Sequence, residues 1–262
     1  MMYKILKQDS LTESTIIEAN TLIHGDCLEV MKHIPDGSVD AIIVDMPYGT
    51  TACKWDNVIP FEPMWEQVKR IIKINGAIVM FGSEPFSSHL RLSNLKQYKY
   101  DWVWQKDKAT NHLNAKHQPM RRNELISVFY CKKSMYNPQL SKKPEKNIRP
   151  ATIKRSQADI YGTMTKESTR GIPLNMSYPN ETLMFRGCFG DKGKSLHPTQ
   201  KPVKLLEYLI KTYTNENELV LDFTAGSFSA GVAAKNTNRK FIGIEMNEGY
   251  FNIGVERMNE NS

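Results

Sequence analysis

The chain has few cysteines and no long apolar run. Its four cysteines, Cys27, Cys53, Cys131 and Cys188, include no C-x-x-C pair, so the sequence predicts neither a zinc site nor a disulfide-stapled scaffold. No stretch approaches the roughly 18 consecutive apolar residues of a membrane span. The first residues also lack the apolar segment of a secretory signal. We therefore expect a cytosolic protein without a membrane partner or a bound metal.

Acidic residues are scarce in the middle of the chain. From Gln105 to Lys204 there are 20 Lys and Arg against 7 Asp and Glu, a balance of +13. Because the whole chain of 262 residues carries +7, the remainder carries 15 basic and 21 acidic residues, or −6. Such asymmetry favours a polyanionic partner for the middle segment, and a solvated basic surface without a partner is the alternative.

Apolar strand patterns alternate with helical periodicity along most of the sequence. Strands are expected within 21–34 and at 39–45, 77–81, 99–106, 124–131, 218–222 and 240–245. Helices are expected at 61–73, where Asn75 and Gly76 would end the helix, and at 201–214. This order predicts an α/β fold whose mostly parallel sheet is covered on both faces and holds ligands at the carboxyl ends of its strands.

One strand ends in a group of residues with distinct chemistry. The apolar run "VDAIIV" is followed by Asp45, Met46, Pro47 and Tyr48. Pro47 restricts its own backbone and that of Met46, so the Met46 carbonyl is held in a fixed direction. A carboxylate acceptor, a carbonyl acceptor and an aromatic face together suit a planar ring that carries an exocyclic amine. Alternatively, Asp45 caps the following turn and Tyr48 packs in the core.

A second strand end has the features of a nucleoside site. "LVLD" ends at Asp222, and the small residues that follow, including Gly226, would let a ligand approach the backbone at a helix N-terminus. The next strand ends at Glu245, 23 positions after Asp222, where a carboxylate is suited to ribose hydroxyls. The segment is not a G-x-G-x-x-G, and an ordinary strand-to-helix turn is the alternative.

Together these motifs resemble a known family. "DMPYG" resembles the D-P-P-Y motif of the DNA amino-methyltransferases, and "LVLDFTAGSFSAGVAA" with "RKFIGIEM" resembles their S-adenosylmethionine motif. "HPTQKPVKLLEYLI" and "HGDCLEVM" are similar to further segments of one subgroup, and the motif order is that of the beta class. The resemblance implies a Rossmann-like, circularly permuted sheet of seven mostly parallel strands. Residues 1–133 would form its catalytic half, 134–194 an irregular basic target-recognition insertion, and 195–262 its cofactor-binding half.

The resemblance also implies roles for single residues. The catalytic residues would be Asp45, Met46, Pro47 and Tyr48. The S-adenosylmethionine site would comprise Asp26, Asp45, Thr199, Lys201, Asp222, Thr224, Gly226, Ser227 and Glu245. Met46 replaces the first proline of the family motif, which is tolerable because a backbone carbonyl acts there. Phe223 and Phe228 replace the usual proline and glycine of the cofactor loop, and they leave its shape and cofactor affinity open.

The activity implied is methyl transfer from S-adenosylmethionine to adenine N6 of a base flipped out of duplex DNA, in a nucleoid-associated protein of a bacterial or phage-type host cytosol. The resemblance also suggests a homodimer. Transfer would be direct, since the chain has no Pro-Cys dipeptide of the kind that cytosine C5 enzymes use. The phosphate contacts are expected to be Arg121, Arg122, Lys132, Lys133, Lys142, Lys143, Lys154 and Arg155. The alternatives are a cytosine N4 enzyme, an RNA methyltransferase and a DNA-binding module that has lost catalysis.

Overall fold

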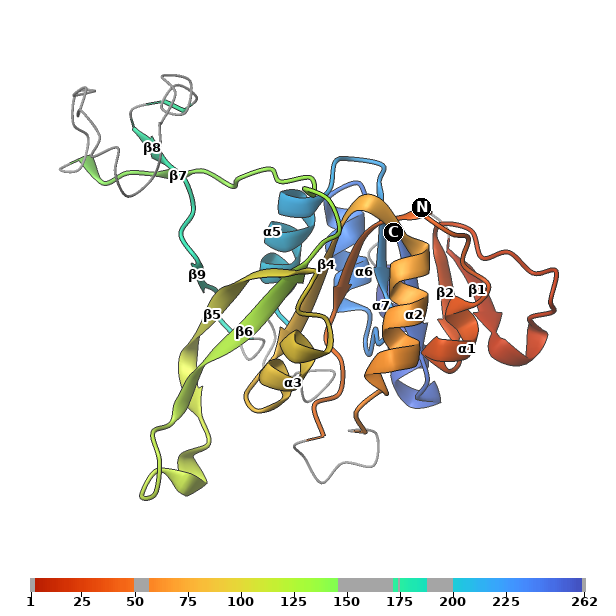
Figure 1. The fold of residues 1–262 in the computed structure, drawn as a ribbon, viewed down its shortest axis with the longest axis horizontal. Helices are drawn as coiled ribbons and strands as arrows, with labels where there is room; N and C mark the ends of the chain where they lie inside the picture. The colour runs from red at the N-terminus through yellow and green to blue at the C-terminus, as the bar shows by residue number, and fades with distance from the viewer. Residues whose placement is uncertain (1–2, 50–56, 146–171, 174, 188–199, 261–262) are drawn as a thin grey trace. The chain divides into compact units, whose positions relative to one another are not determined.

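The computed structural model describes residues 3–49, 57–145, 172–173, 175–187 and 200–260 (Figure 1). Its strands are β1 (Lys4–Lys7), β2 (Thr21–His24), β3 (Val39–Val44), β4 (Ile72–Gly82), β5 (Tyr98–Thr110), β6 (Arg121–Phe129), β7 (Ser141–Lys142), β8 (Met176–Ser177), β9 (Thr182–Met184), β10 (Leu219–Asp222) and β11 (Lys240–Glu245). Its α-helices are α1 (Cys27–Met31), α2 (Phe61–Ile71), α3 (Phe86–Ser93), α5 (Val203–Tyr213), α6 (Ser229–Asn236) and α7 (Glu248–Glu260). Two short 3-10 helices are η1 (Gln8–Ser10) and η2 (His112–Asn114).

The main sheet has nine strands in the order β1-β2-β11-β10-β3-β4-β6-β5-β9. Neighbouring strands are parallel except where β6 pairs with β4 and with β5, so β6 alone runs in the opposite direction. The mostly parallel α/β sheet predicted from the sequence is confirmed. The main sheet has two strands more than the expected seven, because the short β1 and β9 pair with the outer strands β2 and β5.

Helices cover both faces of this sheet, and Figure 1 shows α2 in front of it and α6 behind it. Because side chains alternate along a strand, β3 sends Ala41 and Ile43 to one face and Ile42 and Val44 to the other. The first pair belongs to a buried apolar cluster with α5, α6 and α7, and the second to a cluster with α1, α2 and α3. The sheet is therefore packed between two apolar cores, and these cores hold the ends of neighbouring strands in fixed positions relative to one another.

The end of α2 differs from the sequence expectation. Asn75 and Gly76 do not terminate this helix, which ends at Ile71, and they lie within β4. Ile72 pairs with Val39 of β3, and the register shifts before Ala41 pairs with Ala77. The prediction was wrong because β-branched Ile72 pairs with Val39 and is buried as a strand residue, and this tertiary pairing overrides the local helix signal.

Residues 138–180 form a second compact unit, which is described here by itself. Its β7 and β8 form a short antiparallel pair in which Ser141 is opposite Ser177 and Lys142 is opposite Met176. From Glu181 onward the chain belongs again to the unit that contains the main sheet, and β9 is part of that sheet. None of the helices in the described part of the chain has the length and apolar character needed to cross a membrane.

The two phenylalanines of the β10–α6 loop are buried in opposite cores. Phe223 packs in the cluster that contains α2, and Phe228 packs in the cluster that contains α7. Phe228 has φ +54, a left-handed conformation that a glycine adopts without strain. Its ring fills space left by two glycines, since a Cβ at Gly243 would lie 2.6 Å from Phe228 Cε1 and one at Gly254 would overlap the ring. The loop thus keeps a backbone conformation typical of glycine, and neither phenylalanine side chain lies on the surface.

This packing generates a stability prediction. Gly254→Ala should lower the free energy of unfolding by about 1–3 kcal/mol, because the new methyl group must displace the buried Phe228 ring. Gly249→Ala, also in α7, is the matched control, since an added Cβ there meets only Asn247 Oδ1 at 3.2 Å. The control should leave stability unchanged or raise it by up to about 1 kcal/mol. Chemical denaturation measures both variants, and equal stabilities would contradict the proposed packing.

Candidate active site

The carboxyl ends of β3, β10 and β11 lie side by side, since these strands are parallel neighbours. Two hydrogen bonds join the loops that follow them. The Thr224 hydroxyl donates to the backbone carbonyl of Asp45 (3.0 Å), and the Gly226 N–H donates to Glu245 Oε2 (2.8 Å). The two strand ends singled out in the sequence are therefore parts of one site.

Asp45 takes part in a buried network of ion pairs. Its Oδ2 lies 2.7 Å from Lys201 Nζ, and the same ammonium lies 2.7 Å from Glu124 Oε1. Glu124 Oε2 in turn lies 2.6 Å from Lys106 Nζ. The side chains of Glu124 and Lys201 are only 6% and 8% exposed, whereas that of Asp45 is 21% exposed. The network therefore reaches solvent at Asp45 and at Lys106.

Tyr48 closes a second link between the same carboxylates. Its hydroxyl donates to Asp45 Oδ1 (2.6 Å) and approaches Glu124 Oε1 (3.0 Å). The ring is half-buried and packs against Phe86 at a centroid distance of 5.0 Å. The Lys201 ammonium lies 5.8 Å from the Tyr48 ring centroid and 5.2 Å from that of Phe81. Tyr48 is thus fixed by its hydroxyl and by one side of its ring.

The charges of this network are set by burial and by pairing. Burial raises the pKa of Asp45 above its usual value, and Lys201 and Tyr48 oppose that rise. Burial also favours the neutral form of Glu124, but Lys201 and Lys106 lower its pKa to about 2. Burial lowers the pKa of Lys201, and the two carboxylates reverse the effect and raise it. Glu124 and Lys201 are therefore both charged at neutral pH.

The other two residues of the tetrapeptide shape the backbone. The Met46 side chain is 3% exposed and packs in the cluster of α1, α2 and α3, so only its main chain faces the site. Pro47 is half-buried between Met46 and Tyr48. The predicted role of the Met46 carbonyl, as a hydrogen-bond acceptor for an amine, is compatible with this placement and stays a prediction.

Two further carboxylates lie at the ends of β10 and β11. Asp222 is 6% exposed and accepts a hydrogen bond from the Thr224 N–H (3.1 Å), and burial raises its pKa well above the usual value. Glu245 accepts from the N–H groups of Gly226 and Asn247, and burial raises its pKa as well. Within the described residues, neither carboxylate forms an ion pair. Both are poised to bind a ligand with hydroxyl or cationic groups.

The remaining residues predicted to bind the cofactor lie in different settings. Asp26 caps α1, since its Oδ1 accepts from the N–H groups of Leu28 and Glu29. Ser227 is buried, and its backbone carbonyl accepts from Arg257 Nη1 (3.0 Å). Lys201, also predicted to line the cofactor site, bridges Asp45 and Glu124. Thr199 lies outside the described residues.

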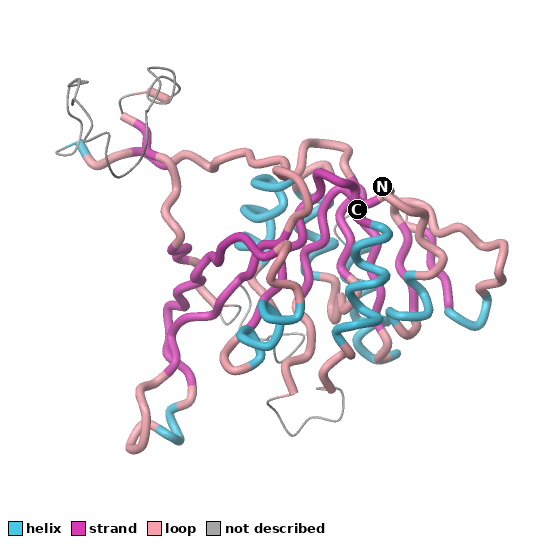
Figure 2. Tube along the Cα trace, in the orientation of Figure 1, coloured by secondary structure: helices cyan, strands magenta, loops and turns pink. Residues whose placement is uncertain are grey.

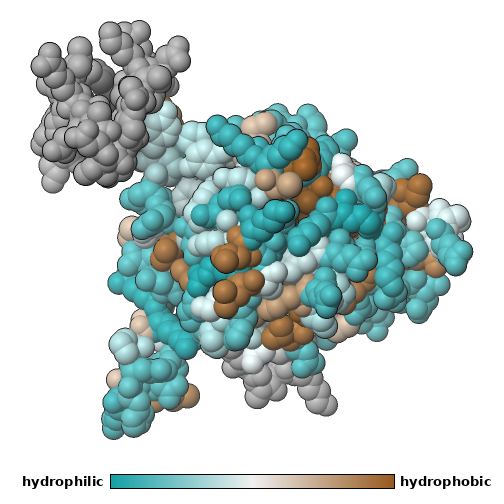
Figure 3. All heavy atoms as spheres, viewed as in Figure 1, coloured by the Kyte–Doolittle hydropathy of each residue, from teal (hydrophilic) through white to brown (hydrophobic). Residues whose placement is uncertain are grey.

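Two of the predicted DNA contacts lie on a projecting hairpin. We call residues 105–123 the distal hairpin; they are the outer parts of β5 and β6 with η2 between them, and Figure 2 shows them continuing beyond the helices. The hairpin carries five basic residues and one acidic residue. Arg121 and Arg122 are exposed there, and Arg122 Nε donates to the Lys106 carbonyl (2.9 Å). Figure 3 shows this end of the molecule as mostly hydrophilic.

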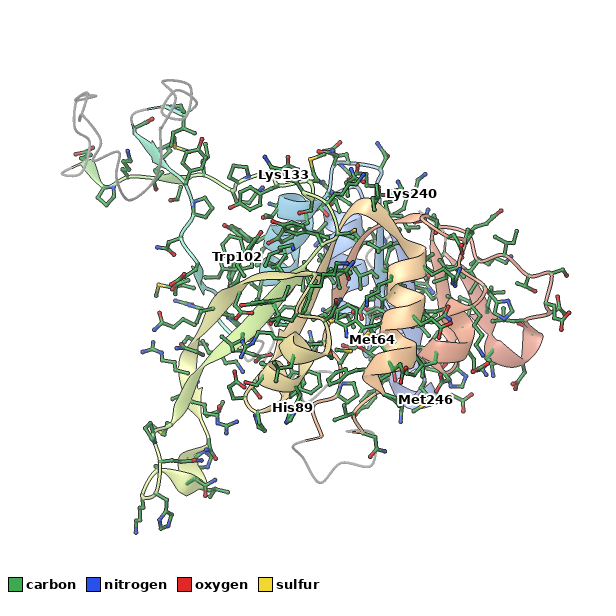
Figure 4. All side chains as sticks on the ribbon, in the orientation of Figure 1. Met64, His89, Trp102, Lys133, Lys240 and Met246 are labelled. Atoms are coloured by element: carbon green, nitrogen blue, oxygen red, sulfur yellow. The ribbon has the colours of Figure 1, made fainter. Side chains whose placement is uncertain are left out.

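Two further predicted DNA contacts, Lys132 and Lys133, do not lie on the distal hairpin. Lys132 and Lys133 follow the end of β6, which lies at the opposite edge of the sheet because β6 is antiparallel to β4. In Figure 4, Lys133 and Lys240, the first residue of β11, lie in the upper part of the view, whereas Met246, which follows the last residue of β11, lies in the lower part. Lys142 and Lys143 belong to the second unit. Lys154 and Arg155 lie outside the described residues.

Sequence reasoning missed Glu124 and Lys106 as parts of the site. Glu124 opens the predicted strand 124–131, where it is the only charged residue in an otherwise apolar run. A lone carboxylate that begins a buried strand was therefore the available signal. Its partners Tyr48 and Lys201 are 76 and 77 positions away in the chain, so spacing could not reveal them.

Comparisons with known proteins agree with this geometry. The family model described as "DNA methylase", for N6 and N4 methyltransferases, matches residues 39–256. The chain is 30% identical to the DNA adenine methyltransferase YhdJ of Escherichia coli, over 92% of this chain and 83% of that protein. It matches the crystal structure of an M1.HpyAVI–SAM complex with a TM-score of 0.63 and 25% identity, over 91% of this chain and 98% of that one. The cytosine-N4-specific PvuII DNA methyltransferase has the same fold, with a TM-score of 0.63 and 15% identity over 94% and 92% of the two chains.

The fold and the two strand ends define an α/β transferase of the Rossmann-like kind, as the solved structures show. The chain belongs to the DNA methylase family whose members modify amino groups at N6 or N4.

The buried network predicts a pH-dependent stability. The pKa of Glu124 in the fold is about 2, below its ordinary value of 4.5, so its ionised form stabilises the fold above about pH 4.5. Glu124→Gln should therefore cost up to about 3 kcal/mol at pH 7, and the difference from the wild type should shrink as the pH falls toward about 2.

Denaturation at several pH values measures this difference. Glu66→Gln, an exposed change in α2, is the matched control and should stay within about 0.5 kcal/mol of the wild type throughout. A loss for Glu124→Gln that does not change with pH would contradict the ionised state of Glu124.

Proposed function

We propose that the protein transfers a methyl group from S-adenosylmethionine to adenine N6 in duplex DNA. The observation that carries this proposal is that hydrogen bonds join the two strand ends. Asp45 and the carboxylates of Asp222 and Glu245 therefore share one edge of the sheet. YhdJ, at 30% identity, is named a DNA adenine methyltransferase, which favours adenine as the base. Each part of the proposal rests on particular side chains.

Asp45 would accept one N–H of the target amine. It is the most exposed carboxylate of its network, at 21%, and Tyr48 and Lys201 hold its two oxygens in fixed positions. The Met46 carbonyl, restricted by Pro47, would accept the second N–H. Two acceptors favour a tetrahedral nitrogen whose lone pair is free to attack, so positioning and electrostatics supply the catalysis. The Tyr48 ring would stack on the flipped base.

The residues at β10 and β11 fit the proposed cofactor. S-adenosylmethionine carries a sulfonium and an ammonium, and a site with two carboxylates lacking cationic partners in the described residues suits a cationic ligand. Gly226 has φ +51 and lets the backbone turn closely beside Glu245. When bound, the cofactor supplies the methyl group. Asp222, Thr224, Gly226 and Ser227 would then lie along its methionine portion, with Glu245 at its ribose and Asp26 at its adenine.

Duplex DNA would contact the distal hairpin. Arg121 and Arg122 would bind phosphates there. The hairpin is next to the buried network, because it contains Lys106 and is followed directly by Glu124. Lys132 and Lys133, at the opposite edge, are not part of this surface. The insertion at 134–194, including Lys142 and Lys143, would add sequence recognition from the second unit. The protein would act on the nucleoid in the cytosol, and light scattering of the purified protein would test for a homodimer.

Identification of the methylated base tests the proposed activity. Duplex DNA treated with the protein and labelled S-adenosylmethionine should yield N6-methyladenine on digestion to nucleosides, and Asp45→Asn should yield none. The asparagine keeps the shape of Asp45 but loses the charge that Lys201 and Tyr48 hold. N4-methylcytosine as the only product would replace adenine by cytosine in the proposal. Label found in single-stranded RNA alone would contradict DNA as the substrate.

Cofactor binding gives an independent prediction. Asp222→Ala should weaken binding of S-adenosylmethionine by roughly tenfold or more, because it removes a buried carboxylate that faces a cationic ligand. Asp45→Asn should bind it within about threefold of the wild type, since the loss there concerns the target amine. Isothermal titration calorimetry measures both. Unchanged affinity in Asp222→Ala would remove Asp222 from the cofactor site.

A further inference from the structure

We propose that Glu124 is a positioning residue for methyl transfer: it holds Lys201 and the Tyr48 hydroxyl, and through both it fixes the orientation and the charge of Asp45. The inference rests on the proposed function. It assigns a role to a residue of β6, which belongs to neither of the two sequence motifs.

The geometry gives Glu124 two separate links to Asp45. The first runs through Lys201 Nζ, at 2.7 Å from both carboxylates, and the second through the Tyr48 hydroxyl, at 2.6 Å from Asp45 and 3.0 Å from Glu124. One Glu124 oxygen, Oε1, receives both contacts. A carboxylate held by two bridges has little freedom to rotate, so the Asp45 oxygens keep a fixed direction toward the site.

Burial makes these links necessary. Lys201 is buried against the Phe81 ring, where an unpaired ammonium would be unfavourable. With Asp45 as its sole partner, Lys201 would form a simple neutral pair with the carboxylate that must accept the amine. Glu124 shares the ammonium, so Lys201 neutralises an ionised Asp45 less completely, and the Asp45 oxygens keep their capacity to accept an N–H. Lys106 pairs with the second oxygen of Glu124, Oε2, from the hairpin side.

The charged groups around Asp45 come from several elements. Lys201 precedes α5, Glu124 lies on β6, and Tyr48 follows β3. Asp222, at the end of β10, interacts electrostatically with Asp45 and with Glu245, which ends β11. Removing the negative charge of Glu124 should make Asp45 easier to ionise, whereas removing Lys106 should make it harder. These two changes therefore predict opposite shifts in pH dependence.

The test measures single-turnover methylation with saturating DNA and cofactor across the acid limb of the pH profile. Glu124→Gln should lower the plateau rate roughly tenfold to a hundredfold, because Asp45 loses its fixed orientation, and should move the acid limb to lower pH. Lys106→Met should move the limb to higher pH. Glu124→Asp keeps the charge with a shorter reach, so its rate should fall while its limb stays near that of the wild type.

Controls separate this role from folding and from the proposed function. Lys99→Met removes an exposed lysine from the other end of β5 and should leave rate and limb unchanged. Titration of the Asp45 carboxylate by carbon-13 NMR, without DNA or cofactor, should show the same opposite shifts. Should Glu124→Gln fail to fold, Lys106→Met and Glu124→Asp still decide the outcome. Shifts of the same sign, or none, in an active wild-type enzyme would overturn the inference, whereas an inactive wild type would overturn the proposed function alone.

Discussion

Three parallel strands that end side by side bring several carboxylates close together. The need to compensate their negative charges governs the structure around Asp45. Asp45, Asp222 and Glu245 end or follow three neighbouring strands, and Glu124 enters from β6. Carboxylates this close would repel one another in a buried setting unless a cation or hydrogen-bond donors compensate them. Lys201 and Lys106 compensate two of the four, and backbone N–H groups support the others. Among the described residues, the site therefore has a paired half, where the carboxylates of Asp45 and Glu124 form ion pairs, and an unpaired half, where those of Asp222 and Glu245 form none.

This division matches the two tasks that methyl transfer requires. The unpaired half, at β10 and β11, favours a cationic ligand and so suits a sulfonium cofactor. The paired half, at β3 and β6, holds acceptor oxygens in fixed directions and suits a neutral amine. The Thr224 hydroxyl connects the halves through the Asp45 carbonyl, so the two proposed ligands would meet at one point. Phe223 and Phe228 do not disturb the arrangement, because each ring lies in a core.

The antiparallel strand β6 links the site to the proposed DNA surface. Its first residues belong to the distal hairpin, and its fourth residue, Glu124, enters the buried network. Because β6 runs opposite to β4, its first residues lie at the same edge as the end of β3, and its last residues lie at the other. This direction places Arg121 and Arg122 on the side of Asp45 and places Lys132 and Lys133 away from it.

Much of this organisation was already determined by the sequence. Local patterns were sufficient for the alternating strands and helices, for the strand that ends in Asp45-Met46-Pro47-Tyr48 and for the glycine-containing turn after Asp222, since each depends on neighbours within a few residues. They failed at Asn75 and Gly76, where pairing with β3 outweighs the helix-ending signal. Only the tertiary structure could place Lys201 between Asp45 and Glu124, decide which edge each basic residue occupies and bury Phe228 against two glycines. Those contacts join distant parts of the chain, and a charge pair or a packed ring leaves no periodic trace in sequence.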